Sequence, residues 1–79
     1  MRVKVKLIAN YQSLLPAEAV GNTVEIEVPD DLTVLQILAP FGVPLDDTSV
    51  IVLNGLTVDL NSPVSEGDVV AAFSAIAGG

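Results

Sequence analysis

The stretch that decides the fold of this chain is residues 49–74, which read SVIVLNGLTVDLNSPVSEGDVVAAFS. Four of its first five residues, Val50 to Leu53, are apolar and mostly β-branched, which predicts a buried strand. Asn54 and Gly55 follow directly and predict a two-residue type I′ hairpin, because both central residues of that turn need a positive φ. We therefore expect residues 56–60 to return as the second strand of this hairpin.

The remainder of this stretch holds two turns and one more strand. Residues 61–63, Asn-Ser-Pro, and residues 66–68, Glu-Gly-Asp, are both typical of turns. Residues 69–74 then predict the last strand, which the second turn holds in register.

Two further segments with alternating polarity precede this stretch. Residues 1–9 alternate charged with apolar side chains, which predicts a half-buried strand. This segment carries every basic side chain of the chain: Arg2, Lys4 and Lys6. Residues 23–28 alternate in the same way, with Glu25 and Glu27 on the outward face. The segment between them is irregular, and we expect Leu14 and Leu15 to pack a short turn onto the core.

Residues 33–41 predict the one main helix. Thr33 and Gln36 have the spacing of a capping box, in which each side chain accepts from the backbone N–H of the other residue. One face of the helix is apolar at helical spacing: Val34, Ile37, Leu38 and Phe41. Pro40 cannot donate a helical hydrogen bond, so we expect a short helix that ends near it, with Gly42 as the stop.

These elements together predict a single α+β domain. Strand pairs before and after one short helix require that helix to cover one face of a mixed four- to five-stranded sheet, which is the β-grasp architecture. We assign residues 1–74 to this domain and residues 75–79 to a flexible C-terminal tail.

Composition and charge exclude several classes of function. Ten acidic and three basic residues give a net charge of −7, which opposes binding to nucleic acids. The chain has no Cys and no His, so thiolate or zinc chemistry and a histidine general base are not expected. The acidic residues do not form a metal-binding pattern. No apolar run reaches the roughly 20 residues of a membrane span, and we expect a cytoplasmic protein.

The tail contains the residues Gly78 and Gly79, and two glycines at chosen positions occur by chance in about 0.5% of sequences. One interpretation is an ordinary frayed terminus. The other is a reactive carboxylate, which attacks the α-phosphate of ATP and forms an acyl-adenylate as pyrophosphate leaves. A sulfur or amine nucleophile then opens the acyl-adenylate and displaces AMP. Because glycine has no Cβ, such a tail can enter a narrow channel, and small neighbours at Ala75 and Ala77 keep it slim.

The chain resembles the ubiquitin-like sulfur carriers, which include the small subunit of molybdopterin synthase and the carrier of the thiamine pathway. Three runs carry the resemblance: Val52-Leu53-Asn54-Gly55, Glu66-Gly67-Asp68-Val69-Val70 and Gly78-Gly79. The resemblance implies that an activating enzyme of the ubiquitin type adenylates Gly79 with ATP and that a thiocarboxylate forms there. The sulfur would then pass to a substrate held by a synthase large subunit. The carrier itself would bind no cofactor and contribute no catalytic side chain.

Two points stay open: which pathway receives the sulfur, and whether the carboxyl end carries sulfur or is joined to other proteins. Molybdopterin-type tails usually have two prolines where this chain has Ser74 and Ala75, and the tail through Ile76 suits a thiamine-type carrier equally. Residues 11–15 form a segment that the shorter thiamine-type carriers lack, so we favour molybdopterin. A protein modifier joined to lysines through Gly79, or a β-grasp interaction module with incidental glycines, are the alternatives.

A candidate partner surface lies on the outward faces of the first and last strands. The resemblance places Val70 and Ala72 inward, which leaves Phe73 either as an interface anchor on the outer face or as a core residue. Three basic side chains are the other candidates: Arg2, Lys4 and Lys6. Their alternative role is cross-strand pairing with Glu25 and Glu27, worth about 0.2–1 kcal/mol for each exposed pair.

Overall fold

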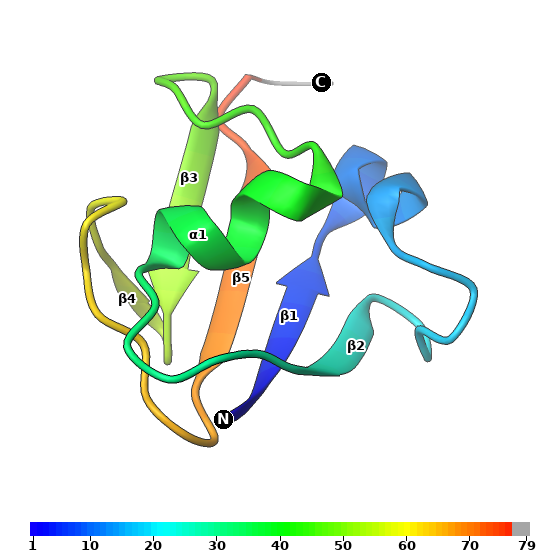
Figure 1. Ribbon diagram of the computed structural model, residues 1–79. Coiled ribbons are helices and arrows are strands. Elements are labelled where there is room, and N and C mark those ends of the chain that lie inside the picture. Colours follow the sequence, from blue (N-terminus) through cyan, green and yellow to red (C-terminus); the bar gives the residue numbers. More distant parts are fainter. Residues whose placement is uncertain (77–79) are drawn as a thin grey trace.

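The computed structural model describes residues 1–76 as a five-stranded mixed sheet with one short α-helix across it (Figure 1). Its elements are β1 (Arg2–Leu7), the 3-10 helix η1 (Ala9–Leu14), β2 (Thr23–Glu27), α1 (Val34–Leu38), the 3-10 helix η2 (Ala39–Phe41), β3 (Ser49–Leu53), β4 (Leu56–Thr57) and β5 (Val69–Ser74). The strand order is β2-β1-β5-β3-β4, with β1 parallel to β5 and every other pair antiparallel. The predicted β-grasp fold is confirmed. Ala77, Gly78 and Gly79 lie outside the described residues.

The core lies between the sheet and α1 and follows the alternation of the central strands. Val5 and Leu7 of β1 are fully buried, and the parallel register sets them beside Val70 and Ala72 of β5, which are also fully buried. The residues between them face the other side of the sheet. We call the side covered by α1 the inner face and the opposite side the outer face.

Helix α1 forms as its sequence predicts. The Thr33 hydroxyl accepts from the Gln36 N–H, and the Gln36 side chain accepts from the Thr33 N–H, which completes the capping box. Pro40 ends the α-helical hydrogen bonding, so the chain continues for one 3-10 turn and stops at Gly42, whose φ is +81°. The apolar stripe packs onto the sheet, with Val34, Ile37 and Leu38 at most 1% exposed.

The returning strand of the second hairpin is much shorter than predicted. The positive φ angles of Asn54 (51°) and Gly55 (87°) confirm the hairpin turn, but β4 covers only Leu56–Thr57. The chain then leaves the sheet and delivers the carbonyls of Leu60 and Ser62 to the N–H groups of Leu35 and Val34, respectively. The first N–H groups of a helix have no partner within the helix, so satisfying them draws this segment away from β3.

In the segment after β1, the side chain that enters the core is not the one expected from the sequence. Tyr11 of η1 is only 6% exposed, whereas Leu14 is 38% exposed. The Tyr11 hydroxyl lies 2.7 Å from the hydroxyl of Ser49, so its polar end is satisfied at the start of β3. Leu15 packs against the core, as predicted.

Candidate functional site

The start of β5 is held by a polar clamp that joins the two turns on either side of residues 56–65. The Asn54 side-chain amide donates to the Asp68 carboxylate (2.9 Å), and its oxygen accepts from the Val69 N–H (2.8 Å). The second Asp68 oxygen accepts from the Ser65 N–H (2.8 Å), and the Asn54 N–H donates to the Val69 carbonyl. The clamp fixes where β5 begins, and with it which of its side chains face inward.

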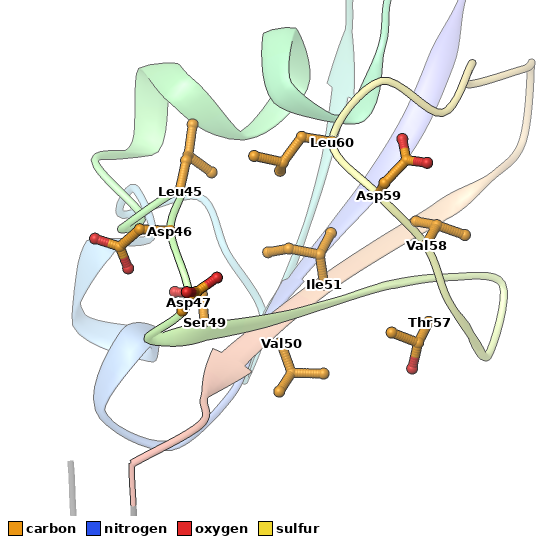
Figure 2. Close-up of a pocket in the computed structure, with 10 residues that line it drawn as sticks. All are labelled: Leu45, Asp46, Asp47, Ser49, Val50, Ile51, Thr57, Val58, Asp59 and Leu60. Carbon is orange, nitrogen blue, oxygen red and sulfur yellow. The ribbon is translucent and has the colours of Figure 1, made fainter.

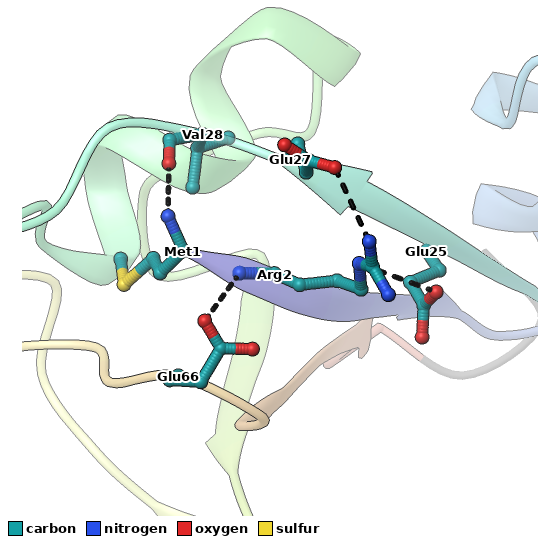
Figure 3. Close-up of polar contacts among 6 residues, drawn as sticks. All are labelled: Met1, Arg2, Glu25, Glu27, Val28 and Glu66. Atoms are coloured by element: carbon teal, nitrogen blue, oxygen red, sulfur yellow. Dashed lines mark hydrogen bonds and ion pairs between the residues drawn. The ribbon is translucent and has the colours of Figure 1, made fainter.

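The same turn is tied to β1, the neighbour of β5 on the side away from β3. The Gly67 N–H donates to the Arg2 carbonyl (2.8 Å), and the Lys4 N–H donates to the Asp68 carbonyl (3.0 Å). The Glu66 carboxylate accepts from the Arg2 N–H at 3.0 Å (Figure 3). The sequence alone predicts residues 66–68 only as a turn that sets the register of the last strand. The structure adds that Asn54, 14 residues earlier than Asp68, is part of the same assembly.

The end of β5 is held as well, by the loop before β3. The Ala75 N–H donates to the Thr48 carbonyl (2.8 Å), and the Ile76 N–H donates to the Ser74 hydroxyl (3.1 Å). Both Ala75 and Ile76 are exposed, and Ile76 is 57% exposed. Of the predicted tail, these two residues are described, and Ala77, Gly78 and Gly79 are not. The chain therefore leaves the sheet at a defined point, beside the start of β3 (Figure 1).

Thr48 is itself positioned by a carboxylate. Its hydroxyl and its backbone N–H both donate to one oxygen of Asp46, at 2.5 and 2.9 Å. These two bonds, the hydroxyl first, hold the pKa of Asp46 below its ordinary value of 3.8, because they favour the ionised carboxylate. The anchor of Ala75 is thus a loop that is stabilised by a charged group at neutral pH.

Phe73 lies on the outer face of the sheet. The antiparallel register sets Phe73 opposite Val50 and Ala71 opposite Val52, while Ala72 between them is fully buried on the inner face. Phe73 is half-buried and is not part of the core cluster. Of the two roles left open by the sequence, a core position is therefore wrong. Phe73 belongs to an apolar stripe along the outer face, whose members are Val50, Val52, Val69, Ala71 and Phe73.

The basic side chains border this stripe, and they pair differently from the expectation. The Arg2 guanidinium contacts Glu27 at 3.3 Å and Glu25 at 3.8 Å (Figure 3). Within residues 1–76, neither Lys4 nor Lys6 forms an ion pair, although the register sets Lys4 opposite Glu25. Predicted pairing with β2 is thus confirmed for Arg2 and wrong for the two lysines.

The difference between Arg2 and the lysines follows from the shape of the groups. A planar guanidinium presents several N–H donors in fixed directions and can engage two neighbouring carboxylates at once. Arg2 thereby contacts both acidic side chains of β2, Glu25 and Glu27. The two ammonium groups stay on the outer face beside the apolar stripe, which makes this face a surface of mixed apolar and basic character.

Two kinds of feature are absent from the described residues: a metal-binding cluster and a membrane-spanning helix. Residues 1–76 contain no group of three or more metal-ligating side chains. No helix within the same range is long and apolar enough to cross a membrane.

Solved structures similar to this one share its architecture over almost the whole chain. SAMP1 from Haloferax volcanii is 25% identical, with a TM-score of 0.77 and full coverage of both chains. A Pyrococcus furiosus protein assigned as molybdopterin converting factor subunit 1 is also 25% identical, with a TM-score of 0.73 over 95% of this chain and 98% of that one.

A third similar structure is a complex of subunits 1 and 2 of molybdopterin-converting factor from Helicobacter pylori. It is 23% identical, with a TM-score of 0.63 and full coverage of both chains, and supports the fold alone. No curated protein sequence matches this chain significantly. The sequence profile of the ThiS family matches residues 5–79, which includes every strand but the first residues of β1. This chain, with the fold of the ubiquitin-like sulfur carriers, belongs to the ThiS family.

Proposed function

We propose that this protein is a sulfur carrier that bears its sulfur as a thiocarboxylate on Gly79. The observation that carries the proposal is the match to the ThiS family over residues 5–79, which spans both β5 and the Gly78-Gly79 pair. The clamps at the two ends of β5 support it, because they deliver the tail from a rigid strand. A rigid exit costs a partner enzyme less ordering entropy when it closes around the residues that follow.

The proposed chemistry takes place on the carboxylate of Gly79. A carboxylate oxygen attacks the α-phosphorus of ATP, the bond to the β-phosphate breaks and pyrophosphate leaves. A hydrosulfide equivalent then attacks the acyl carbon of the adenylate, the bond to AMP breaks, and the thiocarboxylate is formed. An activating enzyme of the ubiquitin type supplies the catalytic groups, and we expect this ATP-consuming reaction in the cytoplasm.

The carrier contributes a substrate atom rather than a catalytic side chain. The complete sequence has neither Cys nor His, so it has no thiol that could capture the acyl-adenylate within the same molecule. It does have two lysines, Lys4 and Lys6, and both belong to the outer face. We propose that this face, with Phe73 as the apolar anchor, docks on the activating enzyme. Docking would also cover the only lysine amines of the carrier.

Molybdopterin synthesis is the destination that we propose for the sulfur. Two fold neighbours are molybdopterin-converting factor subunits, and one of them was solved in complex with subunit 2. By analogy, the large subunit of a synthase would accept the tail and the sulfur. The thiamine pathway is the alternative recipient, since the matching family is named after its carrier.

A second candidate function is modification of other proteins through Gly79. It is favoured by the similarity to SAMP1, which is a small archaeal modifier protein. The first step is the same, because an acyl-adenylate reacts with an amine as well as with sulfur. Only Lys4 and Lys6 could extend a chain of modifiers, so this function would place single copies on targets.

Intact mass spectrometry of the protein isolated from its own cells tests these functions. Replacement of one oxygen by sulfur at the carboxyl end supports the carrier, and adducts on the lysines of other proteins support the modifier. If neither product is found, both the carrier function and the modifier function are contradicted. Deletion of Gly79 should abolish sulfur transfer without changing the unfolding transition. The control is Val20→Ser, at a position that is 85% exposed, and it should leave both sulfur transfer and the unfolding transition unchanged. Sulfur transfer that survives the deletion would exclude the proposed mechanism.

A further inference from the structure

Asn54 is the only asparagine of the chain that is followed by glycine. An asparagine can lose its side-chain amide when the backbone nitrogen of the next residue attacks the side-chain carbonyl carbon and closes a five-membered succinimide ring. Glycine makes this attack easiest, because it has no Cβ to hinder the approach of its nitrogen. The pair Asn54-Gly55 is therefore the place in this sequence where such a modification is chemically most favoured.

The attacking group is open to solvent in the folded protein. Asn54 and Gly55 are both exposed, and beyond the adjacent residues no protein atom lies within 4 Å of the position that a Cβ on Gly55 would take. Within residues 1–76, no backbone carbonyl accepts a hydrogen bond from the Gly55 N–H. Hydroxide can therefore reach this N–H and remove its proton, which is the first requirement of the reaction.

The backbone of the turn, in contrast, holds the two reacting atoms apart. Ring closure needs the Cβ of Asn54 and the nitrogen of Gly55 on the same side of the Cα–C bond of Asn54. The φ of Asn54 is 51°, in the left-handed region, where ψ is about +47°. At that ψ the Gly55 nitrogen points away from the Cβ, so the ring cannot close while the turn keeps its shape.

The side chain of Asn54 is held away from Gly55 as well. Its amide nitrogen donates to the Asp68 carboxylate (2.9 Å), and its oxygen accepts from the Val69 N–H (2.8 Å). Both bonds direct the amide toward the start of β5. The amide must turn toward Gly55 before a succinimide can form, so both bonds have to break first. The clamp thus opposes the modification of the residue on which it depends.

Few other contacts hold this end of the hairpin. β4 lies at the edge of the sheet and pairs with only two residues of β3, and its Leu56 is 71% exposed. Figure 2 shows a groove of about 420 Å³ between the segment after β4, with Val58 and Asp59, and the loop before β3, with Asp47. A segment with so little buried contact opens locally at a low free-energy cost, which leaves the clamp as the main restraint on the turn.

We propose that Asn54 is a site of deamidation and that the clamp sets its rate. When the turn and the clamp open together, the deprotonated Gly55 nitrogen attacks the side-chain carbonyl carbon of Asn54. The bond from that carbon to the amide nitrogen breaks, and ammonia leaves after taking a proton from water. Water then adds to one carbonyl carbon of the succinimide and breaks its bond to the Gly55 nitrogen. Breaking the side-chain bond gives aspartate, and breaking the main-chain bond gives isoaspartate.

Neither product can rebuild the clamp. Each has a carboxylate where Asn54 had an amide, so the donor to Asp68 is lost and two negative charges face each other. Isoaspartate also adds a carbon atom to the main chain of the two-residue turn. Because the clamp fixes where β5 begins, the modified chain holds the start of this strand less firmly. Deamidation thereby converts a reversible opening of the turn into a permanent one.

The rate of deamidation of the full-length protein at mildly alkaline pH tests the proposal, with intact mass spectrometry as the assay and peptide mapping to assign the asparagine. We expect Asn54 to react at least tenfold more slowly in the folded protein than in urea. Asp68→Ala should raise the folded-state rate at least tenfold and leave the rate in urea within twofold. The matched control is Asp59→Ala, which removes a carboxylate that accepts from the Asn61 N–H in the neighbouring turn, and it should leave both rates within twofold.

Destabilisation of the whole domain by Asp68→Ala would also raise the rate, so a second variant separates the two causes. Val24→Ala weakens the core at the opposite edge of the sheet, where Val24 is 6% exposed, and should leave the folded-state rate within twofold. Acceleration equal to that of Asp68→Ala would mean that global unfolding controls the reaction, which would overturn the proposal.

Three further outcomes would also overturn it. They are equal rates at Asn54 in the folded and denatured protein, an unchanged folded-state rate in Asp68→Ala, and unchanged hydrogen exchange of the Val69 amide after deamidation. We expect this exchange to become faster in the modified protein. The test does not involve ATP, sulfur or Gly79, so its failure leaves the proposed carrier function standing, and the converse also holds.

Discussion

The inner and outer faces of the same strands differ in burial, although their residues alternate along the chain. In β5, Val70 and Ala72 are fully buried against α1, while Phe73 beside them is half-buried and outside the core. In β1, Val5 is fully buried and Lys4 is exposed. The inner face thus supplies most of the stability of the domain, and the outer face is the one that we propose contacts partners. Substitutions on the two faces should therefore separate stability from binding.

The largest expected effect is on the inner face, at Leu7. Leu7→Ala removes a fully buried side chain and leaves a cavity, so we expect a loss of about 2–5 kcal/mol in the free energy of unfolding. The outer-face control Lys4→Ala should change it by no more than about 0.5 kcal/mol. Urea denaturation of the two variants measures both values. Equal losses would show that the two faces do not differ in this way.

The next effect concerns Asn54, which determines which residues of β5 face inward. Asn54→Ala removes two side-chain hydrogen bonds and places alanine at a φ of 51°, so we expect a loss of about 2–3 kcal/mol. Asn54→Gly keeps the turn and loses only the bonds, so it should cost about 1–2 kcal/mol. A glycine variant as unstable as the alanine variant would mean that backbone strain contributes nothing.

Phe73 on the outer face should have a smaller effect on stability and a large one on binding. Phe73→Ala should cost about 1 kcal/mol of unfolding free energy, because its contacts are cross-strand contacts with exposed surroundings. Binding to the activating enzyme should weaken at least tenfold, as measured by calorimetry. A loss of several kcal/mol in stability with unchanged binding would make Phe73 a structural residue.

The smallest effect is expected at the exposed carboxylate of Asp46, and it depends on pH. The pKa of Asp46 is lower in the folded state, so its contribution is fully present above the ordinary value of 3.8 and is lost as the pH falls through the lower, folded-state pKa. Asp46→Asn should therefore flatten the acid end of the stability profile. Thr48→Val removes the hydroxyl that causes most of the shift and should flatten it similarly. An unchanged profile in both would contradict this cause.

Much of the fold could be predicted because its signals are local. The capping box of Thr33 and Gln36, the stop at Gly42 and the turn at Asn54 each depend on residues within a few positions of one another. The Asn54–Asp68 clamp could not be derived in this way, because its partners are brought together only when β3 pairs with β5. Asn and Asp bordering two strands that pair with each other are the one signal that could have indicated it.

The sequence alone determined which side chains alternate, where the helix and its cap lie, and where glycine or asparagine must turn the chain, since steric and hydrogen-bonding preferences within a few residues decide these features. Only the tertiary structure decided the length of β4, the burial of Tyr11 and the pairing of the basic residues. Each of these depends on competition between distant groups. Residues 60–62 leave the sheet because carbonyls of this segment accept hydrogen bonds from the first N–H groups of α1. Arg2 contacts both Glu25 and Glu27, so these two carboxylates do not pair with the lysines.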